Sequence, residues 1–185
     1  MLCLRLTPLL VLVLVVSLGA AFPHEGAPRK GCSLFKYKQV IFHEMKAVEK
    51  MQKEFRSIRR LDRTCNTRLL DREWTSAHLS VPDRVLLVQA ELNFTIAMLQ
   101  RPARPSFART RQRPLAFLAQ AREDLQGCVA PSHQPSGELR QWLQNLQLAM
   151  QTVTQENISC LEDYAIRHLF EVLGDLNCAA RQEKC

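Results

Sequence analysis

The stretch from Cys160 to Cys178, CLEDYAIRHLFEVLGDLNC, most constrains what this chain can fold into. Its apolar side chains recur with the period of an α-helix and gather on one stripe, which is typical of a helix packed against a core. The residues of this stripe are Ile158, Leu161, Ala165, Leu169, Val172 and Leu176. We therefore expect one continuous helix here, held in place by a cysteine at each end.

The opposite side of this helix is not purely polar. Asp163 and Arg167 form an acid-before-base pair four positions apart, which supports a helix modestly. Ile166 and Phe170 lie on the same side, although a face in contact with water alone would not need them. We predict that this outer face binds a partner with Phe170 as its hot spot, since large aromatic residues often dominate interfaces. The alternative is that every side of the helix is covered and Phe170 belongs to the core.

The N-terminus has the pattern of a secretory signal peptide. A basic residue, Arg5, precedes the apolar run from Leu9 to Val16, and small residues follow as far as Ala21. The apolar run is too short to span a membrane comfortably. We expect cleavage after Ala21, with Gly19 and Ala20 as alternative last residues of the signal.

Residues 22–185 are enough for a single secreted, extracellular domain with a proper core. The full chain has a net charge of +7 and 7 cysteines, and removal of residues 1–21 takes away one arginine and one cysteine. A positive secreted protein can adhere to sulfated glycans, although a charged, solvated surface is the simpler explanation. The remaining cysteines predict three disulfides, and fifteen connectivities are possible.

Four further helices are expected from the spacing of the apolar residues, at residues 39–60, 80–101, 114–128 and 139–153. Ser80 should cap the second of them, and Pro114 should open the third. The segment 61–79 loses the helical period but stays apolar, which indicates a long loop laid over the other elements. The arginine-rich segment 101–113 is a crossover with room for a short sixth helix. We predict an all-α bundle of about five to six helices, stapled by disulfides.

The first of these helices has one apolar face and one basic face. Gln52 is the one polar intruder on the apolar face, whose other members are Ile41, Met45, Val48, Met51 and Phe55. The basic face carries Lys46, Lys50, Lys53 and Arg60, which we treat as a candidate contact with a partner, although such stripes are often only solvated. Nucleic-acid binding by the arginine-rich segment 101–113 is disfavoured, because the signal peptide routes the chain away from nucleic acid and no stacking aromatics accompany the arginines.

The chain lacks the motifs of common catalytic sites. It contains no nucleophile elbow, phosphate-binding loop, dinucleotide fingerprint or zinc-protease motif, so we do not expect an enzyme. His43 beside Glu44 lacks a third partner, and His168 is better explained as a half-buried packing residue. Scattered histidines and the absence of C-x-x-C pairs predict no metal site, and no cofactor is expected. Of two glycosylation sequons, at Asn93 and Asn157, the second lies in an expected loop and is the better candidate.

A secreted, disulfide-stapled, all-α domain without catalytic motifs is typical of a helical cytokine. The chain also contains, in order, Gly31-Cys32, VPDRVLLVQAELNFTIAMLQ, Pro114-Leu115, Leu139-x-x-Trp142-Leu143, Cys160-Leu161-Glu162 and the pair Cys178 and Cys185. Together these features resemble the type III interferons (interferon lambda) over Gly31 to Cys185.

This resemblance implies an antiviral cytokine that joins a specific lambda-receptor chain to a second chain shared with the interleukin-10 group. Joining these chains activates receptor-bound Janus kinases and interferon-response transcription. In the family the specific chain meets the first helix, the long loop and the last helix, and the shared chain meets the first helix and the helix expected from Pro114. The receptor-binding residues expected here are Asp163, Ile166, Arg167, Phe170, Lys46, Lys50 and Lys53. The partner is then a heterodimeric cell-surface receptor, and the cytokine itself is expected to be a monomer.

The resemblance also implies the disulfides Cys32–Cys128, Cys65–Cys160 and Cys178–Cys185. An unbroken helix would hold Cys178 and Cys185 about 10 Å apart, beyond the roughly 7 Å that a disulfide tolerates. We therefore expect the last helix to stop by about Asn177. In one respect the chain departs from the family, because mammalian members have an aromatic residue at the position of Arg167.

Two other functions remain open from the sequence. The first is another helical cytokine, of the type I interferon or interleukin-10 kind. The second is a cationic host-defence protein that acts directly on microbes or membranes. The basic stripe lacks the adjoining exposed apolar face that membrane binding needs, so no membrane insertion is expected.

Overall fold

The computed structural model describes residues 32–39, 41–58, 65, 67–152, 154, 158–182 and 185, all within the unit Gly31–Cys185. The predicted signal peptide, residues 1–21, lies outside them. The described residues form only helices, which confirms the prediction of an all-α fold. In chain order the elements are η1 (Phe35–Lys38), α2 (Ile41–Ile58), η2 (Arg68–Leu70), η3 (Ser76–His78), α3 (Val81–Leu99), α4 (Pro105–Leu125), α5 (Gly137–Gln151), α6 (Ile158–Arg167) and α7 (Leu169–Arg181). No helix in this part of the chain is long and apolar enough to cross a membrane.

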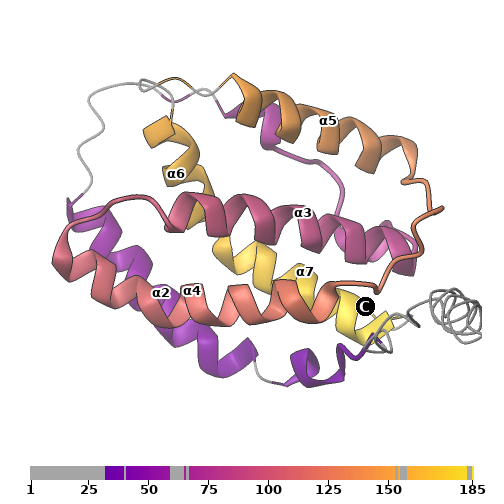
Figure 1. Ribbon diagram of the computed structural model, residues 1–185, viewed down its shortest axis with the longest axis horizontal. Helices are drawn as coiled ribbons and strands as arrows, with labels where there is room; N and C mark the ends of the chain where they lie inside the picture. The colour runs from indigo at the N-terminus through magenta and orange to yellow at the C-terminus, as the bar shows by residue number, and fades with distance from the viewer. Residues whose placement is uncertain are drawn as a thin grey trace, which may run out of the picture. The chain divides into compact units, whose positions relative to one another are not determined.

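Helix α3 is the central element of the bundle, whereas the most regular apolar pattern in the sequence is that of the last helix. In Figure 1 it lies between α4 and α5, and it also contacts α6 and α7. One side of α3 packs with α4 and α7, in a cluster that α2 also joins, through Val85, Val88, Leu92, Ile96 and Leu99. Another side packs with α5, α6 and the long loop through Leu87, Phe94 and Met98. A helix that is apolar on several sides is buried, and α3 therefore separates two hydrophobic clusters.

The N-terminus of α3 begins as the sequence predicts. The side-chain oxygen of Ser80 accepts a hydrogen bond of 3.4 Å from the backbone N–H of Asp83. The Asp83 carboxylate turns away to the loop before α5, where it lies 2.8 Å from Nε2 of His133 and accepts from the backbone N–H of Ser136 at 3.1 Å. Burial opposes ionisation, but these partners prevail and lower the pKa of Asp83. The capping residue is confirmed, and its neighbour fastens the α4–α5 loop.

Helix α4 begins nine residues earlier than predicted. Pro105, not Pro114, occupies its first position, and Pro114 lies buried inside the helix. An interior proline costs about 3 kcal/mol because it removes one backbone hydrogen bond. The turns before it are nevertheless anchored, since Phe107 is buried against Phe55 of α2 with ring centroids 5.5 Å apart. Tertiary packing of the arginine-rich segment thus overrides the usual meaning of a proline.

The single helix predicted from Ile158 onward is in fact two helices, α6 and α7, separated by His168. The side chain of Gln52 reaches this break from α2 and donates to the carbonyl oxygens of Ile166 and Arg167. A side chain that inserts into the hydrogen-bond ladder is a recognised cause of helix breaks. The break adds no residue to the helical repeat, so the apolar stripe runs through it and hides it in the sequence.

Helix α7 extends to Arg181, so the prediction that it stops by about Asn177 is wrong. Asn177 lies inside the helix, and its Nδ2 donates to the carbonyl oxygens of Tyr37 (3.0 Å) and Lys38 (3.2 Å) in η1. The helix ends at Gln182, whose φ of 57° lies in the left-handed region that commonly terminates helices. The required reversal occurs, but one helical turn later than expected.

Three disulfides join described residues, and they are the pairs that the resemblance implies. Their Cα–Cα separations are 4.8 Å for Cys32–Cys128, 5.3 Å for Cys65–Cys160 and 5.0 Å for Cys178–Cys185. The first ties the segment before η1 to the end of α4. The second ties the long loop to α6, and the third closes the end of α7. Two of the three therefore link parts of the chain that are about ninety-five residues apart.

Candidate functional site

The long loop between α2 and α3 is fixed to the bundle by hydrogen bonds to one carbonyl group. The carbonyl oxygen of Leu70 accepts from Nε1 of Trp142 on α5 at 2.9 Å and from the hydroxyl of Tyr164 on α6 at 2.6 Å. All three residues are buried. The described part of the loop therefore has a defined position over α5 and α6, as predicted for a loop laid over the bundle.

A buried ionic cluster fixes the same loop to two core helices. Nη2 of Arg72 lies 3.0 Å from Oε1 of Glu91 on α3 and also contacts Oδ2 of Asp175 on α7. One guanidinium thus faces two carboxyl groups. Burial, followed by the neighbouring Asp175, raises the pKa of Glu91 well above its usual range. The loop is held in part by a cluster whose charge depends on pH.

Arg84 fixes the last part of the loop and the end of α7. It is a buried residue of α3, and its guanidinium donates to the carbonyl oxygens of Ser76 and Ala77, both at 2.9 Å. It also donates to the carbonyl oxygen of Gln182, where α7 ends. One side chain thus fixes the last part of the loop relative to the end of α7.

The outer face of α6 and α7 is smaller than predicted. Phe170 is 37% exposed and belongs to neither hydrophobic cluster, while Arg167 is exposed and its Nε lies 2.8 Å from Oδ2 of Asp163. Ile166 and Asp163 are each only 1% exposed, so their placement on an exposed face is wrong. The physical reason is that Ile166 packs into the cluster that also contains Val48, while Gln52 of α2 bonds to its carbonyl oxygen. The predicted i,i+4 pair is confirmed, with its acid beneath the surface.

The basic face of α2 lies where the sequence predicts, with Lys46, Lys50 and Lys53 exposed. Arg60 lies outside the described residues, as does the side chain of Ile41. Met45, expected in the core, is 40% exposed because its neighbour Glu44 takes the inward position. Glu44 is buried there against Arg113 of α4, whose Nη2 and Nε lie 2.9 and 3.2 Å from the two carboxylate oxygens. A bidentate pair of this kind makes an inward carboxylate tolerable.

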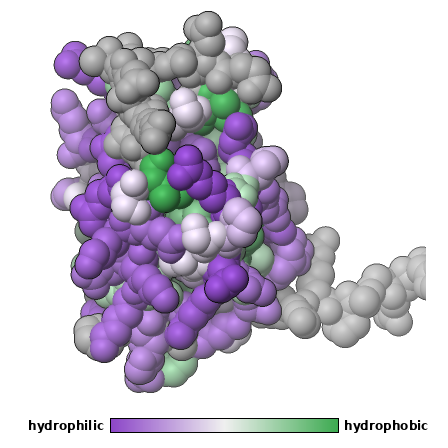
Figure 2. Space-filling model, turned by 90° about the vertical axis from the view of Figure 1, so that its left-hand side faces the viewer, coloured by the Kyte–Doolittle hydropathy of each residue, from purple (hydrophilic) through white to green (hydrophobic). Residues whose placement is uncertain are grey.

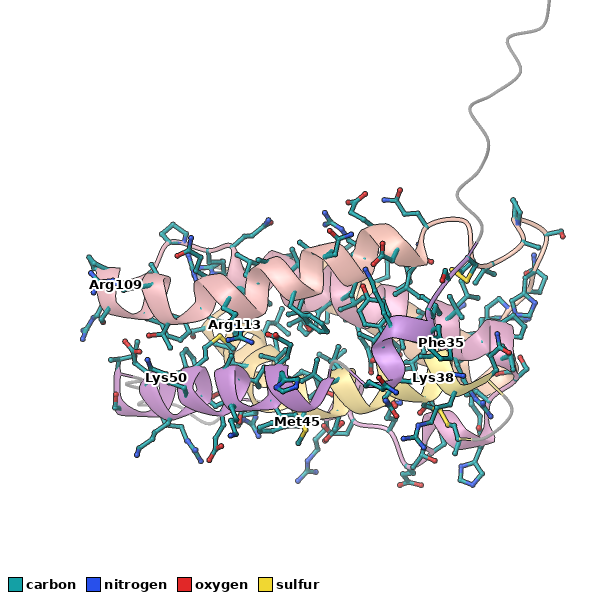
Figure 3. The ribbon with its side chains drawn as sticks, turned by 90° about the horizontal axis from the view of Figure 1, so that it is seen from below. Phe35, Lys38, Met45, Lys50, Arg109 and Arg113 are labelled. Carbon is teal, nitrogen blue, oxygen red and sulfur yellow. A yellow bond between two sulfur atoms is a disulfide. The ribbon has the colours of Figure 1, made fainter. Side chains whose placement is uncertain are left out.

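A second face is formed by α2 and α4 together. Figure 3 shows Arg113 between the two helices, Arg109 toward the start of α4, and Met45 on the edge of α2 away from α4. Arg109 and Lys50 are exposed. The face therefore presents cations of two helices that the Glu44–Arg113 pair holds together.

The end of the bundle where α2 ends and α4 begins is largely hydrophilic. Figure 2 shows this end, where small hydrophobic patches are surrounded by polar residues. Arg104 and Arg109 are exposed here, and Arg101 and Arg111 are partly exposed. Burial, opposed by the nearby Arg101 and Arg111, raises the pKa of Glu162. The arginine-rich segment is thus the exposed start of a helix.

Glu44 and His168 both have structural partners. The Glu44 carboxylate is ion-paired with Arg113, while its neighbour His43 is exposed. His168 is half-buried, stacks on the ring of Tyr164 with centroids 3.9 Å apart, and has Nδ1 2.8 Å from the Tyr164 carbonyl oxygen. It is therefore a packing residue, as predicted.

One of the two glycosylation sequons lies in the described part of the chain. Asn93 is exposed on α3 between the buried residues Leu92 and Phe94, so a glycan on its side chain would extend into solvent. Asn157 lies outside the described residues. Glycosylation at either position stays a prediction.

The chain is a disulfide-stapled helical bundle with a pinned loop, and its outer helices expose basic and aromatic side chains. This is the architecture of a helical cytokine. The family model described as Interleukin-28A matches residues 29–182. The chain is 50% identical to interferon lambda-3 of Gallus gallus over 189 residues, which covers 100% of both chains. It is 29% identical to interferon lambda-3 of Mus musculus, with 98% of each chain covered. It is 28% identical to interferon lambda-1 of Homo sapiens, with 84% of this chain and 80% of the relative covered. The chain belongs to the type III interferon (interferon lambda) family.

Sequence reasoning missed the residues that hold these surfaces in place. No sequence signal marks Arg84 or Arg72, yet Arg84 is buried and the Arg72 side chain is largely so, each against a partner far away in the chain. Gln52 gave a usable signal, because a polar residue within an apolar stripe must find a hydrogen-bond partner.

Proposed function

We propose that this chain is a secreted antiviral cytokine that brings together a lambda-type interferon receptor chain and the chain shared with the interleukin-10 group. Joining the two chains activates their Janus kinases and interferon-response transcription. Membership of the interferon lambda family supports the class of activity. Residues 1–21 act in this proposal as the secretory signal, and residues 22–185 as the single, monomeric cytokine domain.

The position of α2 is the observation that carries the two-receptor proposal. On one side α2 is bonded to α4 through Glu44 and Arg113, and through Glu54, which accepts from the hydroxyl of Thr110. On another side it is bonded to the α6–α7 junction through Gln52. One helix thus borders two separate surfaces, which allows two receptor chains to bind at the same time.

The specific chain is proposed to bind the surface formed by Arg167, Phe170, the adjoining α2 and the pinned loop. Asp163 and Ile166 support this surface from beneath because they are buried. Phe170 is the proposed hot spot, since a large aromatic side chain that the core does not use is typical of an interface anchor.

The shared chain is proposed to bind the face of α2 and α4 that carries Lys50 and Arg109. Lys46 and Lys53 extend the basic face along α2. Charges of this kind chiefly raise the rate of association with a negative partner surface. Correcting the start of α4 to Pro105 lengthens this face, because Arg109 then belongs to the helix.

Reporter cells that express one receptor pair at a time test the proposal. Cells with the lambda-type and shared chains should respond, and cells with either chain alone should not. A response through a type I interferon or interleukin-10 receptor pair would contradict it, as would killing of microbes in the absence of receptor.

Sulfated glycans are a second class of partner, favoured by the three exposed lysines of α2. In that case the mature protein should elute later from a heparin column than a variant with serine at Lys46, Lys50 and Lys53.

A further inference from the structure

The junction between α6 and α7 determines how two proposed receptor contacts are placed relative to each other. Arg167 is the last residue of α6, and Phe170 is the second residue of α7. Between them lies His168, with φ −88° and ψ 6°, outside the usual helical region. The angle of this junction therefore sets the distance and direction from the guanidinium to the aromatic ring.

Gln52 is bonded to this junction at both carbonyl groups that precede His168. Its Nε2 lies 2.7 Å from the carbonyl oxygen of Ile166 and 3.2 Å from that of Arg167. A primary amide nitrogen carries two hydrogens, so it can donate to both oxygens at once. Both carbonyl groups thereby obtain partners that a continuous helix would have supplied from its next turn.

A second group holds the junction from within the helix. The His168 ring stacks on Tyr164 and has Nδ1 2.8 Å from the Tyr164 carbonyl oxygen. The backbone of the junction is thus held by His168 from within the helix and by Gln52 from α2. Gln52 is half-buried, whereas Val48, Met51 and Phe55 on the same face of α2 are apolar core residues. An apolar residue at position 52 would extend that core but would leave the two carbonyl groups without their donor.

We propose that Gln52 is a positioning residue for receptor recognition, which fixes the bend between α6 and α7 so that Arg167 and Phe170 present one surface to the specific receptor chain. The inference rests on the proposed function, because it assumes that this receptor chain binds Phe170. It goes beyond that function by assigning specificity to a residue of α2 that acts through the backbone of another helix. The face of α2 and α4 lies on a different side of α2 and does not depend on the junction.

Two substitutions separate positioning from general stability. Gln52→Met keeps the length of the side chain and removes the N–H donors, while Gln52→Lys keeps donors on a side chain that can reach the same oxygens. We expect Gln52→Met to weaken binding to the specific chain about tenfold, since the loss of two modest hydrogen bonds corresponds to about one factor of ten. Binding of Gln52→Met to the shared chain should stay within about twofold of the original protein. Gln52→Lys should bind the specific chain nearly as tightly as the original protein does.

Surface plasmon resonance with each receptor ectodomain measures these affinities, and amide hydrogen exchange at Phe170 and Glu171 reports the junction. Faster exchange together with selective loss of specific-chain binding supports the inference. Equal weakening of both receptor chains, or no rescue by Gln52→Lys, overturns it in favour of a general structural role. Phe170→Ala is measured in parallel. If that variant loses binding and Gln52→Met does not, the inference fails and the proposed function stands. If Phe170→Ala binds normally, the proposed surface fails, and the inference fails with it.

Discussion

The indole nitrogen of Trp142 lies 2.9 Å from the carbonyl oxygen of Leu70, a residue 72 positions earlier in the chain. The same oxygen accepts from the hydroxyl of Tyr164. Three segments thus meet at one carbonyl group, namely the loop after α2, helix α5 and helix α6. The loop that we propose to bind the specific receptor chain owes its position in part to this convergence.

Removal of either donor should loosen the loop only partly. We expect Trp142→Phe and Tyr164→Phe each to lower the free energy of unfolding by about 1–2 kcal/mol, because each leaves the other donor in place. The double variant leaves a buried carbonyl oxygen without these donors, so its loss should exceed the sum of the two single losses. Denaturant unfolding of the four proteins measures the coupling. Strict additivity would show that the two bonds act independently.

Phe170→Ala should separate receptor binding from stability. The side chain is 37% exposed and lies outside both clusters, so the melting temperature should change little while signalling falls about tenfold or more. Leu169→Ala is the matched control, since Leu169 is the adjacent residue and is fully buried. That control should cost about 2–5 kcal/mol of stability. A Phe170→Ala protein that melts far earlier, or that signals normally, contradicts the assignment.

The stability of the domain should depend on pH through the cluster of Arg72, Glu91 and Asp175. The pKa of Glu91 is raised in the folded protein, whereas an unfolded glutamate titrates near about 4.3. Above that pH the folded state binds a proton that the unfolded state has lost. The contribution of Glu91 to stability is therefore fully present below about pH 4.3 and is lost as the pH rises through the raised pKa.

Denaturant midpoints measured in steps from mildly acidic to neutral pH test this dependence. Glu91→Gln cannot ionise, so its midpoint should change less over the same range. The lowered pKa of Asp83 acts in the opposite direction, because its contribution is present above about pH 3.9 and is lost as the pH falls through the lowered value. Asp83→Asn should therefore lower the midpoint above about pH 3.9 and remove the part of the acidic fall that Asp83 causes. Equal slopes for the original protein and Glu91→Gln would contradict the role of the cluster.

The disulfides should contribute unequally. Cys65 and Cys160 are 95 residues apart, and Cys178 and Cys185 are 7 residues apart. The chain-entropy model assigns about 4–5 kcal/mol to the long closure and about 2 kcal/mol to the short one. Replacing each pair with serines and comparing denaturant midpoints measures the difference. A larger loss for the Cys178–Cys185 pair would show that the end of α7 matters through more than chain entropy.

The sequence alone was sufficient for the fold class and for most helix positions. Periodic apolar residues and the Ser80 cap are local signals, and the start of α3 follows from them directly. It also supplied the basic face of α2 and the exposed Phe170, because the direction of a side chain on a helix follows from its position in the repeat.

Only the tertiary structure decided which of these faces are open. Ile166 has the position of a surface residue in its own helix, yet it is buried in the hydrophobic core. Met45 has the position of a core residue, yet Glu44 takes its place against Arg113. The proline at position 114 and the continuous stripe across His168 misled in the same way. Local patterns record the conformation that a segment prefers by itself, whereas buried ion pairs and side-chain bonds to distant carbonyl groups depend on which helices meet. The period of the chain thus determines its helices, and the contacts between the helices determine which of their faces stay exposed.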